Sequence, residues 1–192
     1  MHADGALWAT RFTHYIHGDL TGRRCDAAGH CAVGSDAGLR ELFYTQRDAR
    51  FTGAEAHAEI ELLRHSMGDL HLDLLGDVVR AELAGGGDVP RIPPWHLGAG
   101  VSWQTRRVDA RVSVKHAGRQ SHPGALDAPT AAYTSVDAQV ALRPWGERRQ
   151  IEFALVGRNL TNSVQRNAVA LNKDEIILPG RDLRLMFRAR FD

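Results

Sequence analysis

The sequence predicts an all-β protein, a segment of an antiparallel up-and-down transmembrane β-barrel with about eight strands. Apolar and polar residues alternate repeatedly along the chain, whereas a helical period of 3.6 residues never extends beyond a few turns. The links between the alternating segments are short and long in turn, which is typical of outer-membrane barrels. The longest apolar runs are far shorter than the roughly 20 residues of a membrane helix, which excludes a helical membrane span.

The segment 183–191 shows the alternation most clearly. One face is apolar and the other is mostly arginine; the apolar residues are Leu183, Leu185, Phe187, Ala189 and Phe191. The other predicted strands are 6–17, 44–62, 69–74, 95–104, 109–115, 136–143 and 151–156. The segments 6–17 and 44–51 alternate poorly, so no buried face is predicted for them.

The links between these strands fall into two sets. The short links are 64–68, 105–108 and 144–148, and the long polar links are 17–39, 84–94, 119–131 and 162–180. Successive links of an up-and-down barrel lie at opposite ends, so the short links share one end. If that end is periplasmic, every long link is extracellular and the chain finishes on the periplasmic side.

A soluble antiparallel sandwich would also show period-2 alternation, because each of its strands buries one face. Two features favour the membrane barrel. The polar faces carry closely spaced charges, as a water-filled lumen tolerates. Aromatic residues stand near strand ends, where the aromatic girdles of a barrel lie; these residues are Trp8, Trp95, Trp103, Tyr133 and Trp145.

Charge and motifs exclude two classes of function. The 24 basic and 23 acidic residues are spread along the chain and give a net charge of +1, so no nucleic-acid partner is predicted. The sequence has no nucleophile elbow, no phosphate-binding glycine loop and no His-Glu-x-x-His helix. We therefore predict that the protein is not an enzyme.

Cys25 and Cys31 are the two cysteines, and they lie in a stretch rich in glycine, aspartate and alanine. A zinc knuckle needs a second ligand pair, so a disulfide within an extracellular loop is favoured.

The chain contains ten histidines, and this is the feature of its composition that points to a possible ligand. His17, His30 and His122 fall in predicted extracellular loops, where neutral imidazoles could capture zinc, haem iron or another borderline metal. The alternative is that they are solvated surface residues. A second group alternates on one strand face and lines either a cation path or a hydrated lumen; its members are Glu55, His57, Glu59 and Glu61.

Five stretches resemble, in order, the closing strands of TonB-dependent outer-membrane receptors: 44–62, 76–104, 129–144, 156–162 and 178–191. The most specific motifs are DARFTGAE at 48–55, PRIPP at 90–94, NLTN at 159–162 and PGR at 179–181. The sequence of the PRIPP motif and that of the LPGR ending are similar to the corresponding sequences in the zinc-uptake branch of this family.

The resemblance implies a barrel of about 22 strands that encloses an N-terminal plug domain with a TonB box. Residues 1–192 would then form the last third of such a barrel. The start, MHADGALWATRF, lacks the features of a signal peptide, so plug, TonB box and signal peptide are all expected to lie outside this chain.

The resemblance also implies a function and partners. The chain would be a fragment of a receptor in the outer membrane of a Gram-negative bacterium, for energised uptake of a metal or metal chelate: zinc, haem or an iron-siderophore. It would have no cofactor apart from this cargo and would not transport alone. Its expected partners are the rest of its barrel and plug, the TonB complex acting through the plug, outer-membrane lipid, and the barrel-assembly machinery, which would recognise Phe191 although Asp192 follows it.

An alternative function stays open. A stand-alone eight-stranded outer-membrane barrel would act as an adhesin or a structural protein, without transport. The soluble sandwich is a third possibility, and it requires that the face of Leu183, Leu185 and Phe187 pack against a second sheet.

Overall fold

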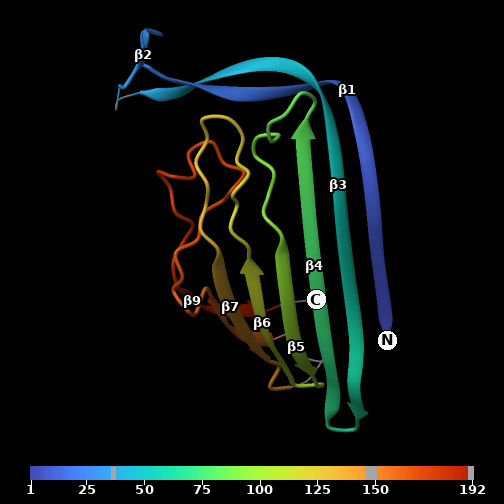
Figure 1. Cartoon of the computed structure of the whole chain (residues 1–192). Coiled ribbons are helices and arrows are strands. Elements are labelled where there is room, and N and C mark those ends of the chain that lie inside the picture. Colours follow the sequence, from blue (N-terminus) through green and yellow to red (C-terminus); the bar gives the residue numbers. More distant parts are fainter. Residues whose placement is uncertain (36–37, 146–150, 190–192) are drawn as a thin grey trace.

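The structure is a computed structural model that describes residues 1–35, 38–145 and 151–189. Within these ranges the chain forms one antiparallel sheet of nine strands, in the order β2-β1-β3-β4-β5-β6-β7-β8-β9 (Figure 1). The strands are β1 (His2–Cys25), β2 (Cys31–Val33), β3 (Leu39–His65), β4 (Gly68–Leu83), β5 (His96–Gln104), β6 (Val108–Ala117), β7 (Tyr133–Leu142), β8 (Ile151–Arg158) and β9 (Asp182–Ala189). No helix in the described ranges is long and apolar enough to cross a membrane.

The predicted fold class is confirmed: the chain is all-β, antiparallel and up-and-down. Each of the eight predicted segments corresponds to one long strand, and the ninth strand is the three-residue β2. The predicted short links at 64–68 and 105–108 are tight turns, whereas the third, 144–148, lies partly outside the described residues.

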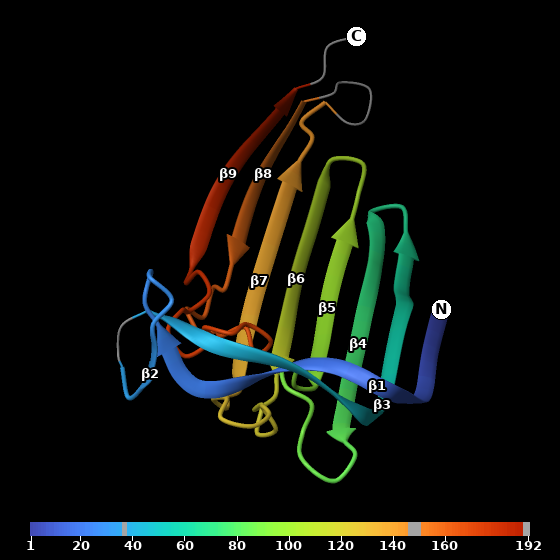
Figure 2. The same ribbon diagram turned by 90° about the horizontal axis from the view of Figure 1, so that it is seen from above.

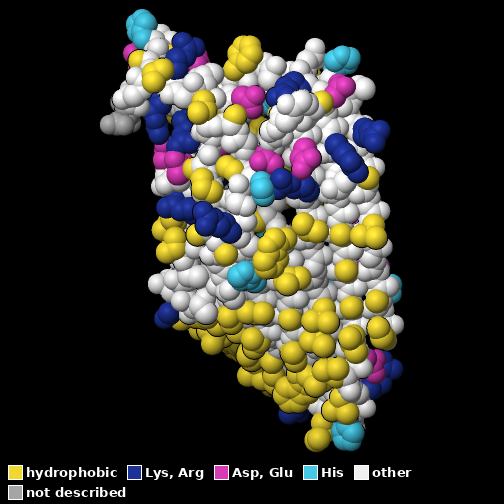
Figure 3. Space-filling model, viewed as in Figure 1, with side chains coloured by type: hydrophobic (Ala, Val, Ile, Leu, Met, Phe, Trp, Pro, Cys, Tyr) yellow, Lys and Arg dark blue, Asp and Glu magenta, His cyan; other side chains and the backbone are white. Residues whose placement is uncertain are grey.

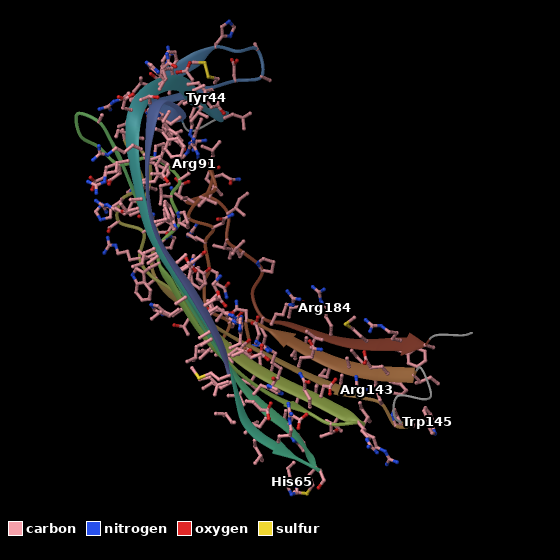
Figure 4. The ribbon with its side chains drawn as sticks, turned by 90° about the vertical axis from the view of Figure 1, so that its right-hand side faces the viewer. Tyr44, His65, Arg91, Arg143, Trp145 and Arg184 are labelled. Atoms are coloured by element: carbon pink, nitrogen blue, oxygen red, sulfur yellow. A yellow bond between two sulfur atoms is a disulfide. The ribbon has the colours of Figure 1, made fainter. Side chains whose placement is uncertain are left out.

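The lower parts of β1 and β3, together with β4–β9, form a curved sheet that we call the wall. Seen edge-on, the wall is an arc with one convex and one concave face (Figure 4). Cross-strand partners point to the same face, so registers such as Leu72↔Val101↔Val112 join apolar residues into continuous rows. Figure 3 shows hydrophobic side chains covering the lower half of the convex face.

The terminal strand excludes the soluble sandwich. Leu183, Leu185 and Phe187 are 64%, 80% and 63% exposed. The nine described strands belong to a single sheet, so this apolar face has no second sheet to pack against.

The upper ends of β1 and β3 leave the wall and cross above the ends of the other strands (Figures 1 and 2). The bend lies at His14, which has a φ of 56°, where the register between β1 and β3 shifts between Phe12 and Tyr15. Both Phe12 and Tyr15 contact the ring of Phe51, at centroid distances of 5.2 and 5.1 Å. This aromatic cluster adjoins the small buried core, which contains Ala49, Ala81, Leu83 and Val89.

The prediction of a long loop at 17–39 is therefore wrong. β1 continues to Cys25 and β3 begins at Leu39, so most of that segment is a two-stranded ribbon. The register slips a second time between Leu20 and Arg24. Two irregularities so close together interrupt the period of two, which is why the sequence shows no strand pattern there.

Ion pairs and hydrogen bonds hold this ribbon to the long loops. The Arg24 guanidinium pairs with Glu175 and that of Arg40 with Asp174, while Arg91 Nη1 donates to the carbonyl oxygen of Gly18 at 3.1 Å. We call residues 14–48 together with the loops 84–94, 119–131 and 159–181 the cap.

The predicted aromatic girdle is correct in part. Trp95 and Trp103 stand at the two ends of β5 on the convex face; the Trp95 ring covers Gly118 and lies 5.1 Å from the His116 ring. Trp8 lies within β1 instead of at its end, and its register with Gly53 places it on the concave face. Tyr133 also faces the concave side, and Trp145 is exposed in the link after β7.

Candidate functional site

The concave face of the wall is the candidate functional site, because charged and imidazole side chains from successive strands line up on it. Glu59 pairs in register with Asp73, which pairs with Gly100 of β5. Likewise Glu55 lies opposite Asp77, and Asp77 lies opposite His96. The acidic row predicted on β3 thus continues onto β4, and His96 of β5 lies next to it.

The part of this face on β1, β3, β4 and β5 combines histidines with carboxylates, and we call it the histidine half. Its members are His2, Asp4, Glu55, His57, Glu59, Glu61, His71, Asp73, Asp77 and His96.

Each histidine of this half lies beside one carboxylate. His96 Nδ1 is 2.9 Å from Asp77 Oδ2, a hydrogen-bonding distance. Asp4 Oδ1 lies 3.5 Å from His57 Nδ1. His71 Nδ1 is 3.7 Å from Oε1 of Glu59 on the neighbouring strand. His2 Nε2 is also 3.5 Å from Asp4 Oδ1, so Asp4 stands beside two imidazoles. His71 and His96 each offer one nitrogen beside one carboxylate oxygen to a cation.

The part on β6–β9 carries arginines together with carboxylates, such as Asp182 at 2.5 Å from Arg184 and Glu152 at 3.5 Å from Arg188, and we call it the arginine half. Its basic members are Arg111, Lys115, Arg158, Arg184 and Arg188. Figure 4 shows Arg184 on the concave side of β9. A hollow of ≈ 220 Å³ lies between Arg111, Asp137, Gln139 and Arg158. The two halves meet where Arg111 Nη1 is 2.7 Å from Asp73 Oδ2.

The sequence analysis described the arginine face of β9 but did not single out Asp73, Asp77, His96 or the basic residues of β6–β8 as site residues. The available signal for most of them was the alternation itself, whereas Asp77 and Arg158 lie beyond the ends of the predicted strands, in the parts by which β4 and β8 are longer. Their assembly on one face depends on strand register, which pairs residues such as Asp77 and His96.

The three predicted metal-contacting histidines lie in separate places. His17 is not in a loop: it lies in β1, is 3% exposed, stacks on Tyr15 and has Nε2 3.3 Å from Asp19 Oδ2. It is buried because the ribbon packs on the long loops. His30 is exposed in a turn, with Nδ1 3.4 Å from Asp26 Oδ2, and His122 Nδ1 is 3.3 Å from Asp88 Oδ2 in another loop.

Among the described residues, one group brings three ligand atoms within 4.8 Å of one another: Cys25, Cys31 and Glu41. Its two sulfur atoms are joined in a disulfide between directly opposed residues of β1 and β2. The sulfurs are thus not thiolate ligands in this structure.

Asp26 organises the turn inside this disulfide loop. Its Oδ1 accepts hydrogen bonds from the backbone N–H groups of Ala28 and His30, both at 2.9 Å. The hydrogen bond from the His30 amide holds the pKa of the Asp26 carboxyl below its usual value. Phe191, the predicted assembly signal, lies outside the described residues.

No protein-family model and no curated protein matches this sequence. Among solved structures, the fold is similar to that of the copper transporter OprC, with a TM-score of 0.75 over 94% of this chain. The match covers 27% of the OprC chain, and the two sequences are 15% identical. The likeness gives no support to the zinc branch suggested by the sequence style. At this identity it shows the fold alone: the chain folds as a segment of a large antiparallel barrel.

Proposed function

We propose that this chain is the C-terminal part of the barrel of a TonB-dependent outer-membrane receptor that takes up a metal ion or a metal chelate. The observation that carries the proposal is the division of the wall into an exposed apolar face and a polar, histidine-bearing face. The ordered sequence motifs and the fold shared with a copper transporter support it.

The convex face suits contact with lipid. Trp103 lies eight positions after Trp95, which corresponds to about 26 Å along a strand and to about 20 Å along the membrane normal at the usual strand tilt of about 40°. The apolar band of an outer-membrane barrel is roughly 25 Å tall and is bordered by aromatic girdles at both interfaces. The indoles therefore stand at a spacing comparable with the height of such a band.

The histidine half suits passage of a metal ion. Imidazole nitrogen and carboxylate oxygen together are ligands for borderline divalent metals such as copper and zinc. Pairs such as His96 with Asp77 offer fewer ligands than a closed site, so each would hold a cation weakly. Weak successive contacts permit an ion both to enter and to leave a pathway. The histidine half does not select one metal.

The sheet edges favour a segment over a stand-alone barrel. β9 ends the sheet on one side, and below the cap β1 ends it on the other. Figures 2 and 4 show an open arc between these edges. In the complete receptor both edges would pair with the remaining barrel strands around a plug, through which the TonB complex would act. The barrel-assembly machinery and outer-membrane lipid would be the other partners.

The test expresses the complete reading frame that contains this chain and measures cellular metal accumulation with and without TonB. An in-frame plug and TonB box should precede the chain. The triple variant H57Q/H71Q/H96Q should lower TonB-dependent accumulation of copper or zinc several-fold. The control H30Q/H65Q/H116Q, which changes histidines away from the concave face, should not.

Two results would count against the proposal. Metal accumulation that does not depend on TonB would remove the receptor assignment. Closure of the 192-residue chain alone into a heat-modifiable barrel would favour the adhesin or structural alternative.

A further inference from the structure

The convex face has an apolar groove of ≈ 580 Å³ directly below the cap. Its floor consists of the small residues Ala54, Ala56 and Gly76, which belong to two adjacent cross-strand rows. Larger apolar side chains border it; these are Leu7, Val78, Trp95 and Leu97. Small residues between large ones leave a shallow apolar depression that is open to the surroundings.

A second hollow of ≈ 240 Å³ adjoins the groove on the side of the cap. The two hollows share Val78 and Trp95. The rim of the upper hollow carries two guanidinium groups, because Arg80 and Arg119 line it.

Four arginines follow one another above the groove, and we call them the arginine row: Arg11, Arg50, Arg80 and Arg119. Arg11 of β1 and Arg50 of β3 are direct cross-strand partners, an arrangement in which like charges repel. Figure 3 shows basic side chains above the hydrophobic band of this face.

The nearby carboxylates do not neutralise this row. Asp48 Oδ1 accepts the backbone N–H of His14 at 2.9 Å. Arg80 engages Glu82 at 3.4 Å and Asp88 at 3.2 Å, and Asp88 is also beside His122. Among the described residues no ion pair involves the exposed guanidinium groups of Arg11 and Arg50. Glu82 is the cross-strand partner of Arg50, but its carboxylate lies 3.4 Å from Arg80 Nε. Two adjacent guanidinium groups that form no ion pair of their own are suited to an anion, above all to phosphate.

We propose that the groove and the arginine row together bind a lipid with a phosphate-bearing headgroup from the surrounding leaflet. Arg80 lies two residues beyond Val78, about 7 Å along the strand, and Arg50 lies four residues beyond Ala54, about 13 Å. A headgroup phosphate bound by the row thus places its acyl chain in the groove. The inference rests on the proposed outer-membrane location, and it is independent of transport.

The test uses the complete receptor, extracted from outer membranes in detergent and analysed by native mass spectrometry. The probes are a bis-phosphorylated glycolipid with saturated chains, the same lipid without phosphates, and inorganic phosphate. R11Q/R50Q should retain the phosphorylated lipid about thirtyfold less than the wild type, since each of the two basic residues near the headgroups contributes about 1 kcal/mol. R106Q/R107Q, with the same charge change in the short turn at the opposite end of the wall, should retain it normally.

The groove is tested separately with Ala56→Leu, which fills its floor, against Ala110→Leu on the convex face outside it. Only the first should reduce retention of the phosphorylated lipid. Equal retention of the lipid without phosphates would overturn the role of the arginine row, and competition by inorganic phosphate at equal concentration would reduce the site to a simple anion site. A wild-type protein absent from the outer membrane would instead refute the proposed function.

Discussion

The wall and the cap are stabilised in different ways. In the wall, each side chain belongs to one of two faces, and neighbouring strands are consecutive in sequence. In the cap, contacts join residues far apart: Arg24 pairs with Glu175, and Lys173 Nζ is 2.6 Å from Asp127 Oδ2. Under the proposed membrane location the wall therefore depends on lipid at one face and water at the other, whereas the cap depends on particular side-chain partners.

The largest expected effect comes from the buried ion pair of the cap. The side chains of Lys173 and Asp127 are 0% and 4% exposed, and Lys173 Nζ also donates to the Ala168 carbonyl at 3.2 Å. Lys173→Met leaves Asp127 buried without its cation, which costs about 3–5 kcal/mol. Hydrogen exchange of the 159–181 loop, followed by mass spectrometry, should show this loss of protection.

The double variant K173M/D127L is the control for that result. It removes both charges, so it should recover most of the lost protection, because replacing a whole buried pair with apolar residues is often neutral. If hydrogen exchange of the 159–181 loop were unchanged in Lys173→Met, the cap would not depend on the ion pair between Lys173 and Asp127.

The next largest effect distinguishes the two faces of the wall. Leu74 and Leu75 are adjacent in β4, similarly exposed at 40% and 45%, and point to opposite faces. Leu74→Arg on the convex face should lower the free energy of unfolding from lipid vesicles by about 2–4 kcal/mol. Leu75→Arg stands among Asp73, Asp77 and His57 and should cost little. Equal costs for the two variants would contradict a lipid-facing convex surface.

This contrast also explains what the sequence could predict. The faces of β4–β9 follow from alternation alone, so residues such as Leu185 were assigned correctly. The cap could not be predicted, because the bend at His14 and its register shift interrupt the pattern. The burial of His17 and the pairing of Lys173 with Asp127 depend on how distant segments of the chain pack together. A local sequence pattern contains no information on such packing.

A smaller effect concerns Cys25 and Cys31. A disulfide closing a loop of sequence separation 6 contributes about 2 kcal/mol by restricting the unfolded chain. The variant C25S/C31S should increase hydrogen exchange at β2 and the end of β1, while exchange in the wall stays unchanged. Mass spectrometry of exported wild-type protein should find the two cysteines linked, and free thiols would place this loop in a reducing compartment.

The smallest effect is the response of the ribbon to acid at Glu41. Hydrogen bonds from Arg23 and then from Thr21, at 2.7 and 2.6 Å, hold the pKa of the Glu41 carboxyl below its ordinary value of 4.5. A carboxyl with a lowered folded-state pKa adds stability that is fully present above 4.5 and is lost as the pH falls through the lower folded value. Arg23→Gln should return this pKa towards 4.5 in a carbon-13 NMR titration, and Arg106→Gln should leave it unchanged. A titration midpoint at or above 4.5 in the wild type would show that the Arg23–Glu41 contact does not persist in solution, and it would weaken the view that ion pairs hold the cap.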